Sequence, residues 1–209
     1  MGRRLMTDGP FLPVVEPGRR PDRSSVFDRL AVVGLGPMGA AVALAARHAF
    51  PSALVIGVDR NDRLENCVRL GAIDIGADDP MVIAEAELVV LAVSRAEQDQ
   101  WIARLPELVP GQAIVTTLGS DEGVPGAAAL LPARFRFIAG HVCFAGSSTD
   151  LRRLSAGELA GAAWALVATE GDPDVSKLAG FVSGLGARPV RLDGEDDLRA
   201  FLQQRDPAL

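Results

Sequence analysis

The sequence has few of the residues that would place the protein outside the cell or in a membrane. Only 2 cysteines occur among its 209 residues, too few for a disulfide framework or a cysteine-rich zinc site. No apolar run reaches the roughly 18 residues that a membrane span needs, because the Ala-rich stretch 40–46 ends at Arg47 and His48. The basic start leads into prolines, not into the apolar centre of a signal peptide. We therefore expect a cytoplasmic protein that does not span a membrane.

Positive charge is also scarce. The 21 Lys and Arg residues oppose 27 Asp and Glu residues, and the pI is near 5.0, which argues against a nucleic-acid surface. Residues 1–27 are an exception, because they are basic, rich in proline and without hydrophobic periodicity. We predict an irregular N-terminal arm for them. Residues 28–209 are long enough for one domain with a full core.

From residue 30 onward, short apolar runs alternate with longer amphipathic stretches. The runs predicted as strands are 30–33, 53–58, 88–93, 113–117, 135–139, 163–168 and 189–192, with a shorter strand at 71–76. The predicted helices are 38–49, 60–70, 96–105, 123–131, 174–185 and 195–204. This alternation is typical of a parallel sheet covered by helices on both faces. The predicted fold is a single α/β domain, a doubly wound parallel-sheet Rossmann fold.

A glycine-rich turn follows the first predicted strand. The strand leads directly into Gly34, Leu35, Gly36, Pro37, Met38 and Gly39, and an Ala-rich helix comes next. In a dinucleotide-binding turn, the first glycine permits the tight turn, the second admits a pyrophosphate and the third lets the helix pack closely. The helix N-terminus then presents N–H groups to the phosphates. Residues 34–39 are therefore predicted to bind a dinucleotide, the alternative being a merely tight strand–helix turn.

The second predicted strand ends at Asp59, which lies 25 residues after Gly34. This is near the offset of the acidic residue that hydrogen-bonds the adenine ribose. A carboxylate there repels a 2′-phosphate, so NAD is favoured over NADP. Arg60 could receive such a phosphate instead, and Asp59 could simply be the N-cap of a helix. Val93 and Ser94, at the end of the strand 88–93, are also expected to contact the cofactor.

Only two histidines are available for acid–base chemistry. His48 lies near the end of a helix, where a cationic side chain suits the helix dipole, and we interpret it as structural. His141 follows the strand 135–139, and Ser120 follows the strand 113–117. Both are predicted at the sheet edge where open α/β sheets bind ligands. The imidazole could take a proton from a substrate hydroxyl while the serine orients it. The alternative is that both are polar loop residues without a catalytic part.

Several motifs follow one another in the order found in a known family. They are Val32–Gly39, Val55–Asn61, Leu70–Asp74, Leu88–Val93, Leu118–Ser120 and Ala139–His141. Over residues 30–192 the chain resembles the nucleotide-binding domain of the prephenate and arogenate dehydrogenases of tyrosine biosynthesis. This resemblance implies oxidation of a cyclohexadienol by NAD or NADP, with loss of the ring carboxylate as carbon dioxide. It also implies that His141 polarises the ring hydroxyl with help from Ser120.

The chain departs from that family's pattern near the expected site. Glu122 stands where the family has a lysine, and Thr117 stands where it has an aspartate. Val142 and Ser94 replace family prolines. A carboxylate at residue 122 would repel a substrate carboxylate that a lysine attracts. The family's C-terminal helical domain, which forms its dimer, has no counterpart in the sequence.

The resulting expectation is an NAD-dependent oxidoreductase, with NADP as the other possible cofactor. It needs no metal and acts on a small prephenate-like substrate. We expect a homodimer in which a neighbouring chain or the helix 195–204 covers the open crevice. Two alternatives remain. One is a nucleotide-binding sensor or partner subunit without catalysis, and the other is a small NADP-dependent reductase of a different substrate.

Overall fold

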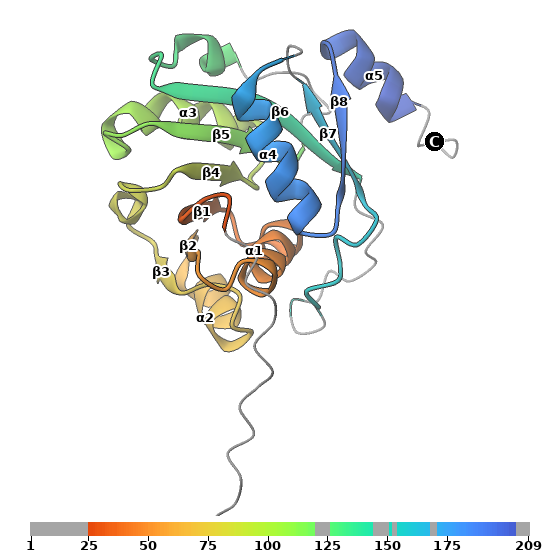
Figure 1. The fold of residues 1–209 in the computed structure, drawn as a ribbon. Helices are drawn as coiled ribbons and strands as arrows, with labels where there is room; N and C mark the ends of the chain where they lie inside the picture. The colour runs from red at the N-terminus through yellow and green to blue at the C-terminus, as the bar shows by residue number, and fades with distance from the viewer. Residues whose placement is uncertain (1–24, 120–125, 144–150, 152–153, 168–170, 204–209) are drawn as a thin grey trace, which may run out of the picture.

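Eight strands form one sheet in the order β3-β2-β1-β4-β5-β6-β7-β8 (Figure 1). The computed structural model describes residues 25–119, 126–143, 151, 154–167 and 171–203. The strands are β1 (Arg29–Val33), β2 (Leu54–Val58), β3 (Ile75–Ala77), β4 (Leu88–Leu91), β5 (Ala113–Thr117), β6 (Phe135–Cys143), β7 (Ala163–Val167) and β8 (Arg188–Leu192). The predicted strands are therefore present, and the order of the first six is that of a Rossmann fold.

Five α-helices and two short 3-10 helices connect the strands. They are α1 (Pro37–Ala49), α2 (Asn61–Arg69), η1 (Pro80–Ile83), α3 (Arg95–Leu108), η2 (Gly126–Leu130), α4 (Pro173–Gly184) and α5 (Glu195–Gln203). The helix predicted over 123–131 is wrong in type, because its described part is the 3-10 helix η2. Pro125 and Pro132 bound this segment in the sequence, and proline at either end limits an α-helix to very few turns.

The fold class is confirmed, but β7 and β8 run against the other six strands. β7 pairs antiparallel with β6, whereas the other strand pairs are parallel. A parallel crossover needs a connection of a dozen or more residues, usually with a helix. The described residues between β6 and β7 contain no α-helix, and the sequence has no helical pattern there. The absence of a helical pattern between β6 and β7 was the sequence signal that β7 runs antiparallel to β6.

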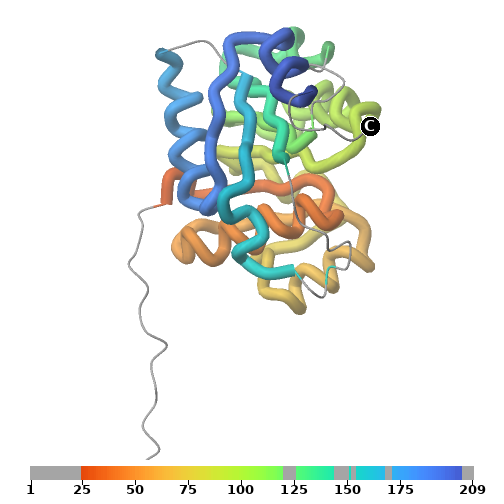
Figure 2. Tube along the Cα trace, turned by 90° about the vertical axis from the view of Figure 1, so that its right-hand side faces the viewer, coloured from red at the N-terminus to blue at the C-terminus, as the bar shows by residue number. Residues whose placement is uncertain are grey.

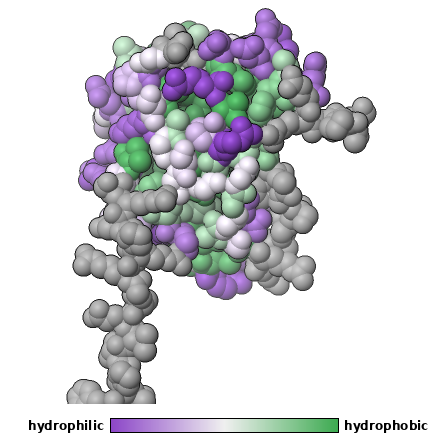
Figure 3. All heavy atoms as spheres, turned by 45° about the vertical axis from the view of Figure 1, so that its right-hand side comes forward, coloured by the Kyte–Doolittle hydropathy of each residue, from purple (hydrophilic) through white to green (hydrophobic). Residues whose placement is uncertain are grey.

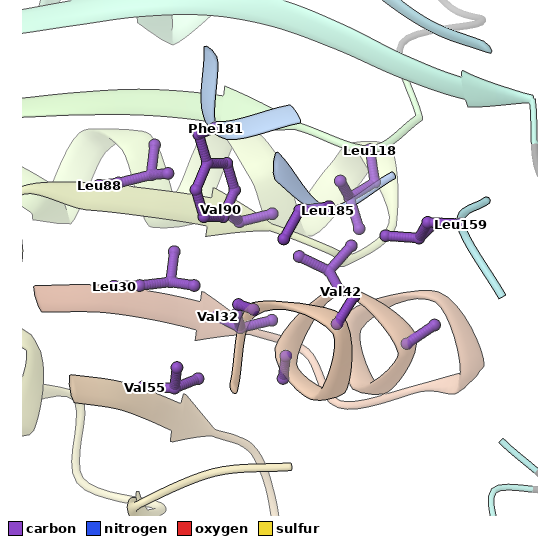
Figure 4. Packing of buried hydrophobic residues seen from close by; sticks show 14 of the residues in the cluster. Leu30, Val32, Val42, Val55, Leu88, Val90, Leu118, Leu159, Phe181 and Leu185 are labelled. Carbon is purple, nitrogen blue, oxygen red and sulfur yellow. The ribbon is translucent and has the colours of Figure 1, made fainter. Parts of the chain in front are cut away.

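The core lies on both faces of the sheet. Side chains of α1, α2 and α4 pack on one face, and those of α3 pack on the other. Figure 4 shows Val42 of α1, Phe181 of α4 and Leu185 just after α4 meeting strand side chains such as Val32 and Val90. This double coverage explains why the central strands are apolar at every position and not only at alternate ones.

The start of the described chain belongs to this core. Phe27, the last residue of the predicted arm, is buried, and its ring lies 5.7 Å from that of Phe181 in α4. Figure 2 accordingly shows α4 beside the first described residues. Residues 1–24 of the arm lie outside the described residues. The boundary between arm and domain stays a prediction.

The surface view in Figure 3 shows hydrophilic side chains along the rim of one face and, within it, hydrophobic side chains mixed with a few hydrophilic ones. Within the described ranges, every helix is too short or too polar to cross a membrane.

Candidate functional site

A cavity opens where the connections leave the sheet in opposite directions. The helix after β1 lies on one face and the helix after β4 on the other, and open α/β sheets bind ligands in the crevice at such a point. The cavity has a volume of about 560 Å³. We call it the switch-point cavity. Five residues predicted to bind the cofactor line it, namely Gly34, Asp59, Arg60, Val93 and Ser94. Arg63, Asp78, Glu97 and Trp101 also line it.

The three glycines of the turn differ in what surrounds them. Gly34 has a φ of +89°, and a Cβ there would lie 2.5 Å from the carbonyl oxygen of Ala92. A Cβ on Gly39 would lie 1.9 Å from the carbonyl oxygen of Gly34. A Cβ on Gly36 would meet no atom within 4 Å. The fold itself therefore requires Gly34 and Gly39, while the space beside Gly36 is open to a ligand.

Helix α1 begins directly at this open space. Its N-cap is Gly36, Pro37 is its first residue, no side chain caps it, and no acidic residue lies in its first turn. The amides of a first helical turn have no partner within the helix, and they carry a partial positive charge. Met38 and Gly39 belong to that turn. The arrangement fits an anionic group such as a diphosphate.

Asp59 is fixed to the glycine turn. Its Oδ2 accepts a hydrogen bond from the backbone N–H of Leu35 at 2.6 Å, and its Oδ1 accepts one from the N–H of Arg60 at 2.8 Å. The guanidinium of Arg63 also reaches Oδ2, at 3.1 Å. The N-cap alternative for Asp59 is wrong, because α2 has Arg60 at its N-cap. The carboxylate thus lies beside the turn, with lone pairs left for a hydroxyl ligand.

The two arginines of this region have different partners. Arg60, which the sequence suggested as a phosphate ligand, forms an exposed ion pair with Asp62. Arg63, which sequence reasoning missed, pairs with Asp59. The spacing of four residues was an available signal, since oppositely charged residues at i and i+4 meet at the start of a helix. Arg63 is therefore the guanidinium that pairs with Asp59.

Cys67 of α2 is not a candidate nucleophile. Burial, reinforced by the negative charge of Asp59, raises the pKa of the Cys67 thiol to about 11. The thiol is protonated at neutral pH, and the thiolate is the reactive form.

Ser94 begins α3 on the opposite side of the switch-point cavity. Its N–H donates to Glu97 Oε2 at 3.0 Å, and its hydroxyl donates to the same oxygen at 2.6 Å. This is a capping box, which satisfies amides at the helix start. Ser94 stands where the resembled family has a proline, and its side chain has a structural use here.

His141 lies within a strand and not beyond its end. β6 continues to Cys143, and His141 pairs with Ala165 of β7. The pairing of β6 with β5 ends earlier, at Ile138. His141 therefore lies past the carboxyl end of β5, at the predicted edge of the sheet. The strand is longer than predicted because β7 supplies a second partner, which a local pattern does not reveal.

Thr117 supports the backbone next to His141. Its hydroxyl accepts a hydrogen bond from the N–H of Gly140 and donates to the Gly140 carbonyl, both at 3.0 Å. A Cβ on Gly140 would lie 2.3 Å from the carbonyl oxygen of Thr117. The threonine side chain thus bonds both backbone groups of Gly140 where the regular pairing of β5 with β6 ends. Thr117, which stands where the resembled family has an aspartate, therefore has a structural role here.

The structure brings only part of the predicted site together. Gly34, Asp59, Arg60, Val93 and Ser94 line one cavity. The remaining predicted cofactor residues are not among its lining residues; they are Gly36, Pro37, Met38 and Gly39, at the start of α1. His141 lies at the same edge of the sheet but is not among the residues that line this cavity, and β5 separates β6 from β4. Ser120 and Glu122 lie outside the described residues. Their relation to His141 stays a prediction.

Sequence comparison identifies relatives of the chain. The family model described as "Prephenate dehydrogenase, nucleotide-binding domain" matches residues 42–191. The prephenate dehydrogenase of Bacillus subtilis (strain 168) is 31% identical over 122 residues, which are 54% of this chain and 32% of that protein. The chain thus matches about a third of the length of this curated relative.

Solved structures of the same kind share the fold. The arogenate dehydrogenase of Synechocystis has a TM-score of 0.73 at 23% identity, covering 85% of this chain and 64% of its own. A prephenate dehydrogenase from A. aeolicus, solved in complex with hydroxyphenyl propionate and NAD+, has a TM-score of 0.75 at 20% identity, covering 86% and 64%. With the family match over most of its length, the chain belongs to the family of prephenate dehydrogenase nucleotide-binding domains.

Proposed function

We propose that the switch-point cavity binds NAD and that this domain is the coenzyme-binding part of an oxidoreductase. The observation that carries the proposal is the contrast among the glycines. Gly34 and Gly39 are enclosed by the chain's own backbone, whereas Gly36 faces open space at the uncapped start of α1. A chain without a ligand has no need of a glycine at residue 36, but a bound diphosphate does.

The charges of the cavity favour NAD over NADP. Asp59, Asp78 and Glu97 line it together with Arg60 and Arg63, so negative side chains outnumber positive ones. The carboxylate of Asp59 can accept hydrogen bonds from ribose hydroxyls, whereas a 2′-phosphate would place negative charge beside it. When bound, NAD supplies a two-electron acceptor.

The proposed substrate is a prephenate-like cyclohexadienyl compound. This part of the proposal comes from the relatives, which are named prephenate and arogenate dehydrogenases. Oxidation of such a ring alcohol requires a base for the hydroxyl proton. We assign that proton to His141, the only histidine of the chain near the carboxyl edge of the sheet. Ser120 is proposed to orient the same hydroxyl.

The test combines binding with turnover. The sequence has two tryptophans. Trp101 lines the cavity and Trp164 is buried, so quenching of Trp101 fluorescence reports NAD binding. NADH formation is then followed with prephenate and with arogenate, in the wild type and in His141→Ala. We expect turnover in the wild type that His141→Ala abolishes while NAD affinity is kept.

Two other results would change the assignment. NAD binding without NADH formation from either compound would contradict the catalytic part and favour a sensor or partner subunit. Tighter binding of NADP than of NAD would contradict the role given to Asp59. The homodimer and the cytoplasmic location stay predictions, and a monomeric mass by light scattering at micromolar concentration would contradict the first.

A further inference from the structure

Gln98 is an exception on the buried side of α3. The other buried residues of this helix, Ile102, Leu105 and Leu108, are apolar. They follow Gln98 at the spacing of a single helix face. Gln98 is only 1% exposed. Burying an amide costs free energy unless it is hydrogen-bonded, so its contacts require an explanation.

The side-chain amide of Gln98 joins two loops. Its Nε2 donates to the carbonyl oxygen of Val93 at 3.2 Å and to that of Gly119 at 2.9 Å. Val93 lies two residues beyond the end of β4, and Gly119 lies two residues beyond the end of β5. One side chain thus holds together the segments that follow two neighbouring strands. The nearest backbone link between them, from Leu118 N–H to Leu91 O, is long at 3.3 Å.

The other end of the amide has no partner among the described residues. Gln98 Oε1 is buried, and no group in the described part of the chain donates to it. An unpartnered buried acceptor destabilises a fold. A leucine at this position would extend the apolar face of α3 without that cost. The Gln98 amide is therefore better explained by its hydrogen bonds to two carbonyl groups than by a contribution to the stability of the fold.

One of the two loops that Gln98 joins borders the proposed coenzyme site. Val93 lines the switch-point cavity, and Ser94 after it begins α3. We infer that Gln98 is a positioning residue for the coenzyme, because its amide fixes the Val93 backbone against Gly119 and so sets the wall of the cavity. This inference rests on the proposed function. Two N–H donors on one nitrogen hold both carbonyl oxygens at once, and neither an ionised carboxylate nor a methyl group supplies a donor.

The first test removes the amide. Gln98→Leu is compared with Gln100→Leu, which makes the same chemical change at an exposed position of the same helix. NAD affinity is measured by Trp101 fluorescence, and folding is checked by thermal unfolding. We expect Gln98→Leu to bind NAD about tenfold more weakly, with both variants folded and Gln100→Leu equal to the wild type. Equal NAD affinity in Gln98→Leu and the wild type would overturn the inference.

The second test uses Gln98→Glu across a pH series. A protonated carboxyl group has one O–H donor, whereas the ionised form has none and is repelled by both carbonyl oxygens. NAD affinity of this variant should therefore fall as the pH rises through the pKa of the introduced carboxyl group. The wild type and Gln98→Leu should lack that transition. A merely structural role predicts no transition in any of them, and that result would overturn the inference even if Gln98→Leu fails to fold. Absence of NAD binding in the wild type would instead refute the proposed function.

Discussion

The two halves of the sheet hold their candidate residues in different ways. We call β1, β2 and β4 with α1 and α2 the glycine half, and β5, β6 and β7 the histidine half. In the glycine half, contacts between the backbone of the turn and its neighbours fix the site, and Asp59 is anchored to Leu35 of the same turn. In the histidine half, side chains fix it, with Thr117 bonded to Gly140 and Gln98 to Gly119. The glycine half therefore follows from a known motif with a known spacing to Asp59, whereas the neighbourhood of His141 depends on side-chain contacts that no motif records.

The largest expected effect is a difference in stability between alanine substitutions at two glycines of the same turn. Gly39→Ala places a Cβ 1.9 Å from the carbonyl oxygen of Gly34, so we expect it to lower the free energy of unfolding by about 3 kcal/mol or more. Gly36→Ala meets no atom and should stay within about 1 kcal/mol of the wild type. Gly36→Ala should nonetheless lose NAD affinity. Denaturant unfolding and fluorescence titration of both variants measure these effects, and NAD binding by Gly36→Ala at wild-type affinity would contradict the account.

A second substitution tests whether a change in the histidine half affects NAD binding by the glycine half. Gly140→Ala directs a Cβ toward the carbonyl oxygen of Thr117, 2.3 Å away. We expect a loss of about 2–3 kcal/mol in unfolding free energy, because β5 and β6 must separate there. NAD affinity of the folded variant should be unchanged, since Gly140 does not line the switch-point cavity. A parallel loss of NAD binding would show that the two halves are coupled.

Two adjacent threonines provide a sharper comparison within the histidine half. Thr117→Val removes the hydroxyl that bonds to both backbone groups of Gly140 and should cost about 1–2 kcal/mol. Thr116 is equally buried, but its Oγ1 has no partner among the described residues. Thr116→Val should therefore be neutral or stabilising. Equal losses in both variants, measured by thermal unfolding, would refute the role given to Thr117.

The charge of the glycine half is expected to set coenzyme preference. Asp59→Asn removes the carboxylate that pairs with Arg63 and should raise the affinity for NADP relative to NAD by about tenfold. Adding Arg63→Gln should reverse this gain, because the freed guanidinium is then absent. Arg60→Gln in place of Arg63→Gln is the matched control, since Arg60 pairs with the exposed Asp62. Competition titrations with NAD and NADP give the ratios, and a larger effect from Arg60 would contradict the assignment.

The same contrast explains what the sequence could predict. The strands, the turn and the position of Asp59 follow from hydrophobic runs and glycine spacing, which are local features. The length of β6 and the direction of β7 depend on which strands pair, and a one-dimensional pattern does not record pairing. The contacts of Gln98 and Thr117 join segments more than 20 residues apart. Asp59 and Leu35 are just as far apart, but a known motif spacing marks Asp59. No such motif marks the contacts of Gln98 and Thr117, so the surroundings of His141 were the weaker part of the prediction.

The most direct test of the account is a crystal structure of the domain with NAD. The account predicts the diphosphate beside Gly36, with amides of the first turn of α1 about 3 Å from its oxygens, and a ribose hydroxyl at Asp59. A second cavity of about 610 Å³, lined by Arg134, Lys177 and the first residues of β5 and β6, lies at the opposite edge of the sheet. NAD bound there, with the space beside Gly36 empty, would contradict the central claim.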